Sequence, residues 1–222
     1  MKALIKKTTV GQILVFSLKK GESINVEPGA IISATGDIEI KSGISGGLGT
    51  GLLRAVGGGE SLFINTVTAL EDADVEIGAV MPSEMAEIDL DGALILGDGV
   101  YLAHVGDIKI TSRFGGLTSL AAGSGLMFLY AEGKGKLYIT AAESLHQKEL
   151  KAGEKFYLDN SCFVGANADA KIEKFLAGKG LLSKVVGGEG VMLKFTGPAT
   201  VFYQSESPRS LASYLAQFIS RK

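Results

Sequence analysis

The sequence predicts an all-β fold with one C-terminal helix, in which a single β-module occurs three times. Three observations predict it. Short apolar or alternating segments recur along the chain and are separated by Gly, Asp, Lys or Asn. Two sequence patterns each recur three times, in the same order. No helical periodicity is sustained before residue 205.

The expected strands are short, as in a chain that turns back on itself frequently. Each is a run of alternating or apolar residues bounded by turn-forming residues. They are predicted at 13–18, 23–26, 30–34, 37–40, 61–67, 100–105, 107–112, 125–131, 136–140, 155–158, 162–166, 191–195 and 200–204.

The last part of the chain has a different pattern, which predicts an amphipathic helix over 207–220. Ser207 is a suitable N-cap and Pro208 suits the first helical position. Apolar residues then recur at spacings of three and four. We expect this helix to pack on the β-domain with the face formed by Leu211, Tyr214, Leu215, Phe218 and Ile219.

The first repeated pattern aligns residues 29–40, 99–110 and 161–172 without gaps. Each copy reads as two strands joined by a tight turn, and the first two copies share a Gly-Asp-Ile turn sequence. Glycine supplies a positive φ at such a turn and the Asp carboxylate can accept a backbone N–H. The aligned acidic positions are Asp37, Asp107 and Asp169.

The second pattern follows the first and predicts a glycine-rich hairpin before an apolar strand. Its copies begin at Gly51, Gly125 and Gly180, and each has another glycine eight residues later. Together the patterns predict one domain, 1–206, with pseudo-repeats at about 18–80, 88–145 and 150–205. We expect a double-stranded β-helix, like that of the tryptophan RNA-binding attenuation protein (TRAP-like), or a β-prism-like arrangement.

The amino-acid composition narrows the range of possible functions. The chain has 222 residues, with 22 basic and 24 acidic side chains, which argues against a broad polyanion-binding surface. One cysteine excludes an intrachain disulfide and a multi-cysteine metal site, and two histidines leave little room for a histidine-rich metal site. The N-terminal apolar stretch is interrupted by Gly11, Gln12 and Ser17, unlike the core of a signal peptide. We therefore expect a cytoplasmic protein.

Candidate catalytic and metal-binding residues are few. None of the 31 glycines completes a dinucleotide or phosphate-loop pattern. His104 lies mid-strand where the other copies have alanine, and His146 lies in a polar connection. Cys162 occupies an aligned position at which the other copies have small apolar residues. The carboxylates between Glu71 and Asp91 lack calcium-loop spacing and read as a solvated acidic edge. We expect no catalytic site, metal or cofactor, so we do not expect an enzyme.

One set of residues has the character of a nucleic-acid contact. Lys134 and Lys136 lie in a glycine-rich loop, with Tyr138 just beyond. Proteins that bind single strands combine basic grooves with stacking aromatic rings. These three residues are the candidate RNA contact, and the contact would be stronger in an oligomer that repeats it.

Three stretches, 18–33, 46–65 and 123–139, resemble a widespread family named after altered inheritance of mitochondria. The resemblance runs from about Leu18 to Phe218, and its motif is a glycine-rich hairpin followed by an apolar strand. It implies a fold like that of the tryptophan RNA-binding attenuation protein. The fungal member is connected with mitochondrial inner-membrane organisation. The resemblance implies no catalytic residue.

The expected function is a non-enzymatic scaffold or protein-interaction module that forms a homo-oligomer. Two alternatives stay open. One is an RNA-binding or small-ligand-binding protein resembling the attenuation protein. The other is a membrane-associated organising protein acting through the C-terminal helix, although the uncharged polar face of that helix is a weak membrane signal and we do not expect membrane association.

Overall fold

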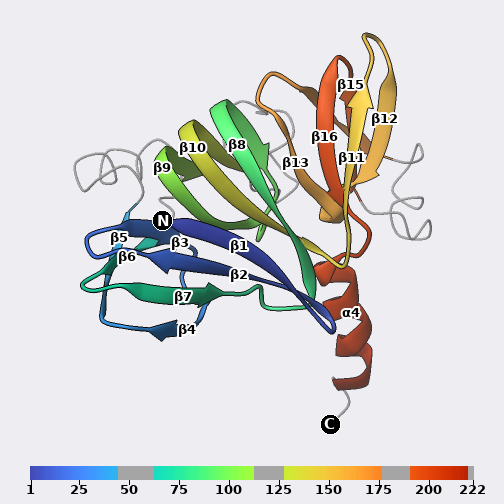
Figure 1. The fold of residues 1–222 in the computed structure, drawn as a ribbon. Helices are drawn as coiled ribbons and strands as arrows, with labels where there is room; N and C mark the ends of the chain where they lie inside the picture. The colour runs from blue at the N-terminus through green and yellow to red at the C-terminus, as the bar shows by residue number, and fades with distance from the viewer. Residues whose placement is uncertain (45–62, 113–127, 177–190, 220–222) are drawn as a thin grey trace.

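The computed structural model describes residues 1–44, 63–112, 128–176 and 191–219, and it is mostly antiparallel β-structure with one C-terminal helix (Figure 1). The predicted β-class and the C-terminal helix are therefore confirmed. The glycine-rich hairpins predicted at 51–63 and 180–192 lie almost entirely outside the described residues. The hairpin predicted at 125–137 is wrong over its described part, because Gly133 and Gly135 lie inside one continuous strand, Leu129–Ala142.

The strands fall into three consecutive sets. The first set has β1 (Lys2–Thr8), β2 (Gly11–Leu18), β3 (Ser23–Val26), β4 (Ile31–Thr35), β5 (Ile38–Ile44), β6 (Phe63–Ala69) and β7 (Ala73–Ile77). The middle set has three long strands, β8 (Ser83–Leu96), β9 (Tyr101–Ser112) and β10 (Leu129–Ala142). The last set has β11 (Leu145–Leu150), β12 (Lys155–Asp159), the 3-10 turn η1 (Asn160–Cys162), β13 (Phe163–Asn167), β14 (Lys171–Leu176), β15 (Val191–Thr196) and β16 (Ala199–Gln204).

The strands of each set pair in the same order. In the middle set β10 lies between β8 and β9 and pairs with both. In the first set β7 lies between β2 and β4, and β6 lies between β3 and β5. In the last set β16 lies between β11 and β13, and β15 lies between β12 and β14. Each long strand of the middle set thus corresponds to two short strands in the other sets.

The sets are joined by strand pairing at two places. Strand β3 pairs with β9, and β8 pairs with β13. A nine-stranded sheet therefore runs through all three sets. No pairing joins β12 back to β4 among the described strands, and these two strands lie on opposite sides of the molecule (Figure 1).

The turns that break the outer strands are built alike. The turn from β2 to β3 is closed by a hydrogen bond from the Glu22 N–H to the Lys19 carbonyl (2.9 Å), and the Lys19 N–H donates to the Glu22 carboxylate (2.8 Å). The turn from β11 to β12 has the same two hydrogen bonds between Lys151 and Glu154 (2.9 Å each).

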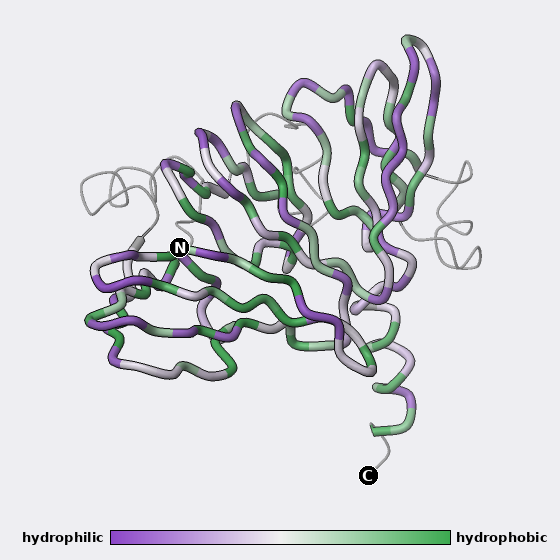
Figure 2. Tube along the Cα trace, viewed as in Figure 1, coloured by the Kyte–Doolittle hydropathy of each residue, from purple (hydrophilic) through white to green (hydrophobic). Residues whose placement is uncertain are grey.

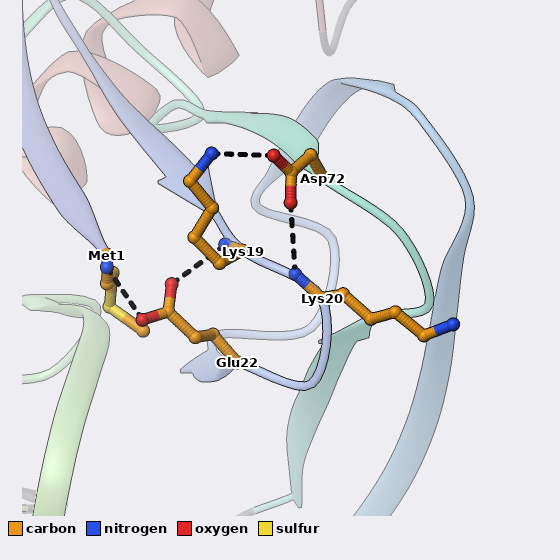
Figure 3. Close-up of polar contacts among 5 residues, drawn as sticks. All are labelled: Met1, Lys19, Lys20, Glu22 and Asp72. Carbon is orange, nitrogen blue, oxygen red and sulfur yellow. Dashed lines mark hydrogen bonds and ion pairs between the residues drawn. The ribbon is translucent and has the colours of Figure 1, made fainter.

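Both of these glutamates also pair with a cation. The Met1 amino group donates to Glu22 at 2.7 Å, and Lys148 lies 3.1 Å from Glu154. Figure 3 shows the first turn, where Lys19 and the Lys20 N–H in addition contact Asp72, at 2.6 and 3.3 Å. A backbone N–H and a positive charge together stabilise each carboxylate and so fix the turn.

The middle set bends without breaking because glycines face one another across its strands. Gly133 of β10 pairs with Gly92 of β8, and Gly135 pairs with Gly106 of β9. A Cβ on Gly133 would lie 2.0 Å from the Asp107 carbonyl oxygen, so the backbones are closer there than any side chain allows. The predicted Gly-Asp-Ile turn is correct at Gly36, where φ is 89°. It is wrong at Gly106, which lies inside the continuous strand β9.

Each set contributes most of one hydrophobic cluster. The clusters include buried aromatic rings that contact edge to face, among them Phe16 with Tyr138 and Phe128 with Phe163, with ring centroids 5.1 and 5.4 Å apart. Figure 2 shows apolar and polar residues alternating along the strands, as expected where one sheet face is buried.

A buried polar contact lies beside the β3–β9 pairing. The Tyr101 hydroxyl is 2.8 Å from Nδ1 of His104 and 3.3 Å from the Asn25 carbonyl oxygen. A neutral His104 that carries its proton on Nδ1 satisfies both contacts. Burial lowers the pKa of His104 to about 4, so the ring is neutral at physiological pH.

The C-terminal helix α4 (Pro208–Ile219) begins where the sequence predicts, and the Ser207 hydroxyl accepts a hydrogen bond from the Ser210 N–H (3.1 Å). The expected packing is wrong. Leu211, Tyr214, Leu215, Phe218 and Ile219 are exposed, at 39–79% of their surface. These side chains are exposed because α4 contacts the β-domain near its start, beside η1, and then extends away from the strands (Figure 1).

We expect Gly133→Ala to lower the free energy of unfolding by about 3 kcal/mol or more, because the new Cβ meets backbone atoms and φ is 132°. Chemical denaturation measures the change. Gly43→Ala is the control, since nothing lies within 4 Å of its added Cβ. Equal stability of the two variants would contradict the close approach of the strands.

We expect the free energy of unfolding to fall as the pH drops from about 6.5 to about 4, by roughly 3 kcal/mol from His104. The unfolded chain takes up a proton at the ordinary histidine pKa, whereas the folded chain resists protonation, so the effect is absent above that pKa. Urea titrations at several pH values compare the wild type with His104→Gln, which should lose this component. His146→Gln, at an exposed ring, should keep it; the same slope in all three proteins would refute the assignment.

Candidate functional site

A cavity of about 690 Å³ lies where the three sets of strands meet. Its wall includes residues 27–32, residues 97–100 and, from the stretch 160–163, Asn160, Ser161 and Phe163, together with residues 78–81. The first three segments are corresponding connections: each follows β3, β8 or β12 and leads into β4, β9 or β13. The ends of β10 and β16 complete the wall with Thr140, Ala142 and Gln204.

Backbone hydrogen bonds position the connections. The Glu27 N–H donates to the Leu102 carbonyl in β9 (2.9 Å), and the Gly97 N–H donates to the Val164 carbonyl in β13 (2.8 Å). These are the same bond made at the two places where one set joins the next. The connection 27–30 is itself a tight turn, because the Ala30 N–H donates to the Glu27 carbonyl (3.1 Å) and Gly29 has a φ of 87°.

Much of the cavity wall is apolar. Val100, Phe128 and Phe163 are buried within it, whereas Ile32 and Val80 are exposed at its border. A cavity of this size and lining is typical of sites for small, largely apolar molecules.

The polar groups of the wall differ in how they are satisfied. The side-chain oxygen of Gln204 accepts from the Ala142 N–H (2.9 Å), its amide donates to the Ser161 carbonyl (3.0 Å), and the Ser83 hydroxyl donates to the Met81 carbonyl (2.8 Å). The Thr140 hydroxyl is buried without a hydrogen bond to the described residues. Burial, with a smaller contribution from the negative charge of Asp98, raises the pKa of Glu27.

The predicted RNA contact does not form a basic, aromatic surface. Lys134 and Lys136 lie in strand β10, not in a loop, opposite the acidic residues of β8. Lys134 pairs with Asp91 at 2.7 Å, and Lys136 pairs with Glu87 and with Asp89.

A base-stacking role for Tyr138 is wrong, because its ring is 1% exposed and packs against Phe16. Its hydroxyl donates to Glu87 at 2.8 Å. The acidic residues that read as a free edge, Glu87, Asp89 and Asp91, lie instead beside the lysines of the neighbouring strand.

The other candidate side chains have packing roles in the described structure. His104 is buried against Tyr101, and His146 stacks on Tyr203 with ring centroids 5.1 Å apart. Cys162 is half-buried in η1, and burial raises the pKa of its thiol, which opposes formation of the reactive thiolate. Among the described residues no three His, Cys, Asp or Glu side chains gather as metal ligands.

Sequence reasoning missed Glu27, Asp98 and Thr140. A signal for Glu27 and Asp98 was present. The gap-free alignment of 29–40, 99–110 and 161–172 also aligns the residues that directly precede these segments, and these include Glu27 and Asp98. Thr140 carried no signal, because the cavity exists only once the ends of distant strands are brought together.

No helix in the described ranges is long and apolar enough to cross a bilayer.

Comparison with known proteins finds the same fold over almost the whole chain. A crystal structure of a protein from Streptococcus pyogenes superposes with a TM-score of 0.80 at 21% identity, covering 98% of this chain and 99% of the other. An uncharacterised protein of Streptococcus pyogenes serotype M6 is 23% identical over 229 residues, which are 99% of this chain and 91% of the relative. The profile of the family described as mitochondrial biogenesis AIM24 matches residues 5–206. The chain therefore belongs to the AIM24 family, as the glycine-rich stretches of its sequence indicated.

Proposed function

We propose that this protein is a non-enzymatic binding protein, made of three copies of one β-module, whose cavity takes a small and largely apolar ligand. The observation that carries the proposal is that the corresponding connection of each set lines the same cavity. The sequence-based alternative of a small-ligand binder thus has more support than an RNA binder, because Lys134 and Lys136 are paired with carboxylates.

Three features support the modular part of the proposal. The strands of each set pair in the same order. Glu22 and Glu154 close their turns with the same contacts. The bond from Glu27 to Leu102 recurs between Gly97 and Val164. We propose that the modules stand side by side around the cavity within one domain, 1–206, and leave it open between the last module and the first.

The non-enzymatic part rests on what the reactive side chains do. The His104 ring is held neutral in the core and Cys162 is held as a thiol, so neither is prepared for acid–base or nucleophilic chemistry. The unpaired cysteine fits a reducing compartment, which supports the cytoplasmic location that the sequence predicts.

The exposed apolar face of α4 favours a second candidate function, a scaffold that assembles with further copies of this chain. The helix points away from its own β-domain, and its apolar side chains are exposed in the single chain (Figure 1). Two such helices in a symmetric dimer would cover each other, because the same face occurs on both copies.

We expect the neutral apolar dye N-phenyl-1-naphthylamine to bind with one site per chain and to gain fluorescence. Ala79→Phe, which places a ring in the cavity wall, should weaken dye binding about tenfold or more. The matched control Ala170→Phe changes a similarly half-buried alanine outside the cavity and should leave binding unchanged. Wild-type protein that binds no dye would refute the proposed function.

We expect light scattering after size-exclusion chromatography to give the mass of a dimer for the wild type and of a monomer for Phe218→Glu. Phe218 is 70% exposed, so the substitution disturbs no core. Ser213→Glu, on the opposite face of α4, adds the same charge and should remain dimeric. A monomeric wild type would exclude assembly through this helix.

A further inference from the structure

The charged residues of the cavity wall all have the same sign. They are Glu27 and Asp98, and the wall has no Lys, Arg or His among the described residues. They lie on corresponding connections, one before β4 and one before β9. The cavity therefore combines a largely apolar wall with a local negative charge that the described residues of the wall do not neutralise.

Carboxylates elsewhere in the described structure are commonly matched by a cation. Glu22, Asp72 and Glu154 each lie within 3.1 Å of an amino group. Glu27 is half-buried, yet its carboxylate makes neither a hydrogen bond nor an ion pair with the described residues. Burying a carboxylate without a partner is costly, and the raised pKa of Glu27 reflects that cost.

We propose that the cavity binds an amphiphilic amine, with its ammonium group held by Glu27 and Asp98 and its apolar part against Val100, Phe128 and Phe163. This inference rests on the proposed function and names its ligand class. An ammonium group supplies the charge that the wall lacks and offers three N–H donors to the carboxylate oxygens. An apolar tail gains by burial against the rest of the wall.

A metal ion fits this wall less well than an amine. Divalent cations in proteins take six or more oxygen ligands or a compact set of three or four side chains. The wall offers two carboxylates, one of them on an exposed connection, within a largely apolar surface. That combination favours an organic cation over a bare ion.

Isothermal titration calorimetry with decylamine, decanol and decanoate, at neutral pH and below micelle-forming concentrations, tests the proposal. The three probes share one tail and differ in headgroup charge. We expect decylamine to bind about tenfold or more tightly than decanol, and decanoate to bind most weakly. Glu27→Gln and Asp98→Asn should each reduce the advantage of decylamine over decanol. Asp74→Asn, which removes an exposed charge outside the cavity, should preserve it.

The outcomes separate the two proposals. Equal binding of decylamine and decanol overturns the amine preference while the apolar cavity stands. An amine preference that survives in both Glu27→Gln and Asp98→Asn also overturns it, because the charge then acts elsewhere. If none of the three probes binds, the proposed ligand-binding function itself fails. Because Asp98 is exposed, its variant keeps the test valid even if Glu27→Gln folds poorly.

Discussion

The close approach of backbones at the bend of β8, β9 and β10 is the constraint on which the rest of the structure depends. Facing glycines let three long strands turn together without losing their pairing. The first set of strands attaches to β9 and the last attaches to β8, so both outer sets take their orientation from these bent strands. The cavity lies between them because the connections that lead into β4, β9 and β13 then converge.

The sequence predicted those features that depend on local pattern. Alternation predicted the strands, and Ser207 and Pro208 predicted the start of α4. It did not predict the cavity, because that depends on contacts between distant strands. The same Gly-Asp pair forms a turn at Gly36 and a bend at Gly106, and the partner strand decides which. Tyr138 shares a strand face with the two lysines by alternation, but its ring is buried because Phe16 of β2 packs against it.

Charged residues with structural roles differ from those at the candidate site in whether an opposite charge is paired with them. Along β8 and β10, and at the turns closed by Glu22 and Glu154, opposite charges are paired at the surface. Such pairs add little stability individually but keep strands and turns in register. Glu27 differs from them: it is half-buried with no cation paired to it among the described residues, and burial raises its pKa. Uncompensated charge of this kind is more often found at functional sites than in purely structural positions.

The open side of the molecule has a consequence for its behaviour at high concentration. Strand β4 is an edge strand among the described residues, and the segment Ile31–Thr35 has no charge, no proline and an exposed Ile32. Edge strands normally carry charges that deter addition of a further strand, as Lys171 and Lys174 do on β14. Strand β4 lacks that protection, so it is the edge at which intermolecular sheet growth, and hence aggregation of a destabilised chain, would begin.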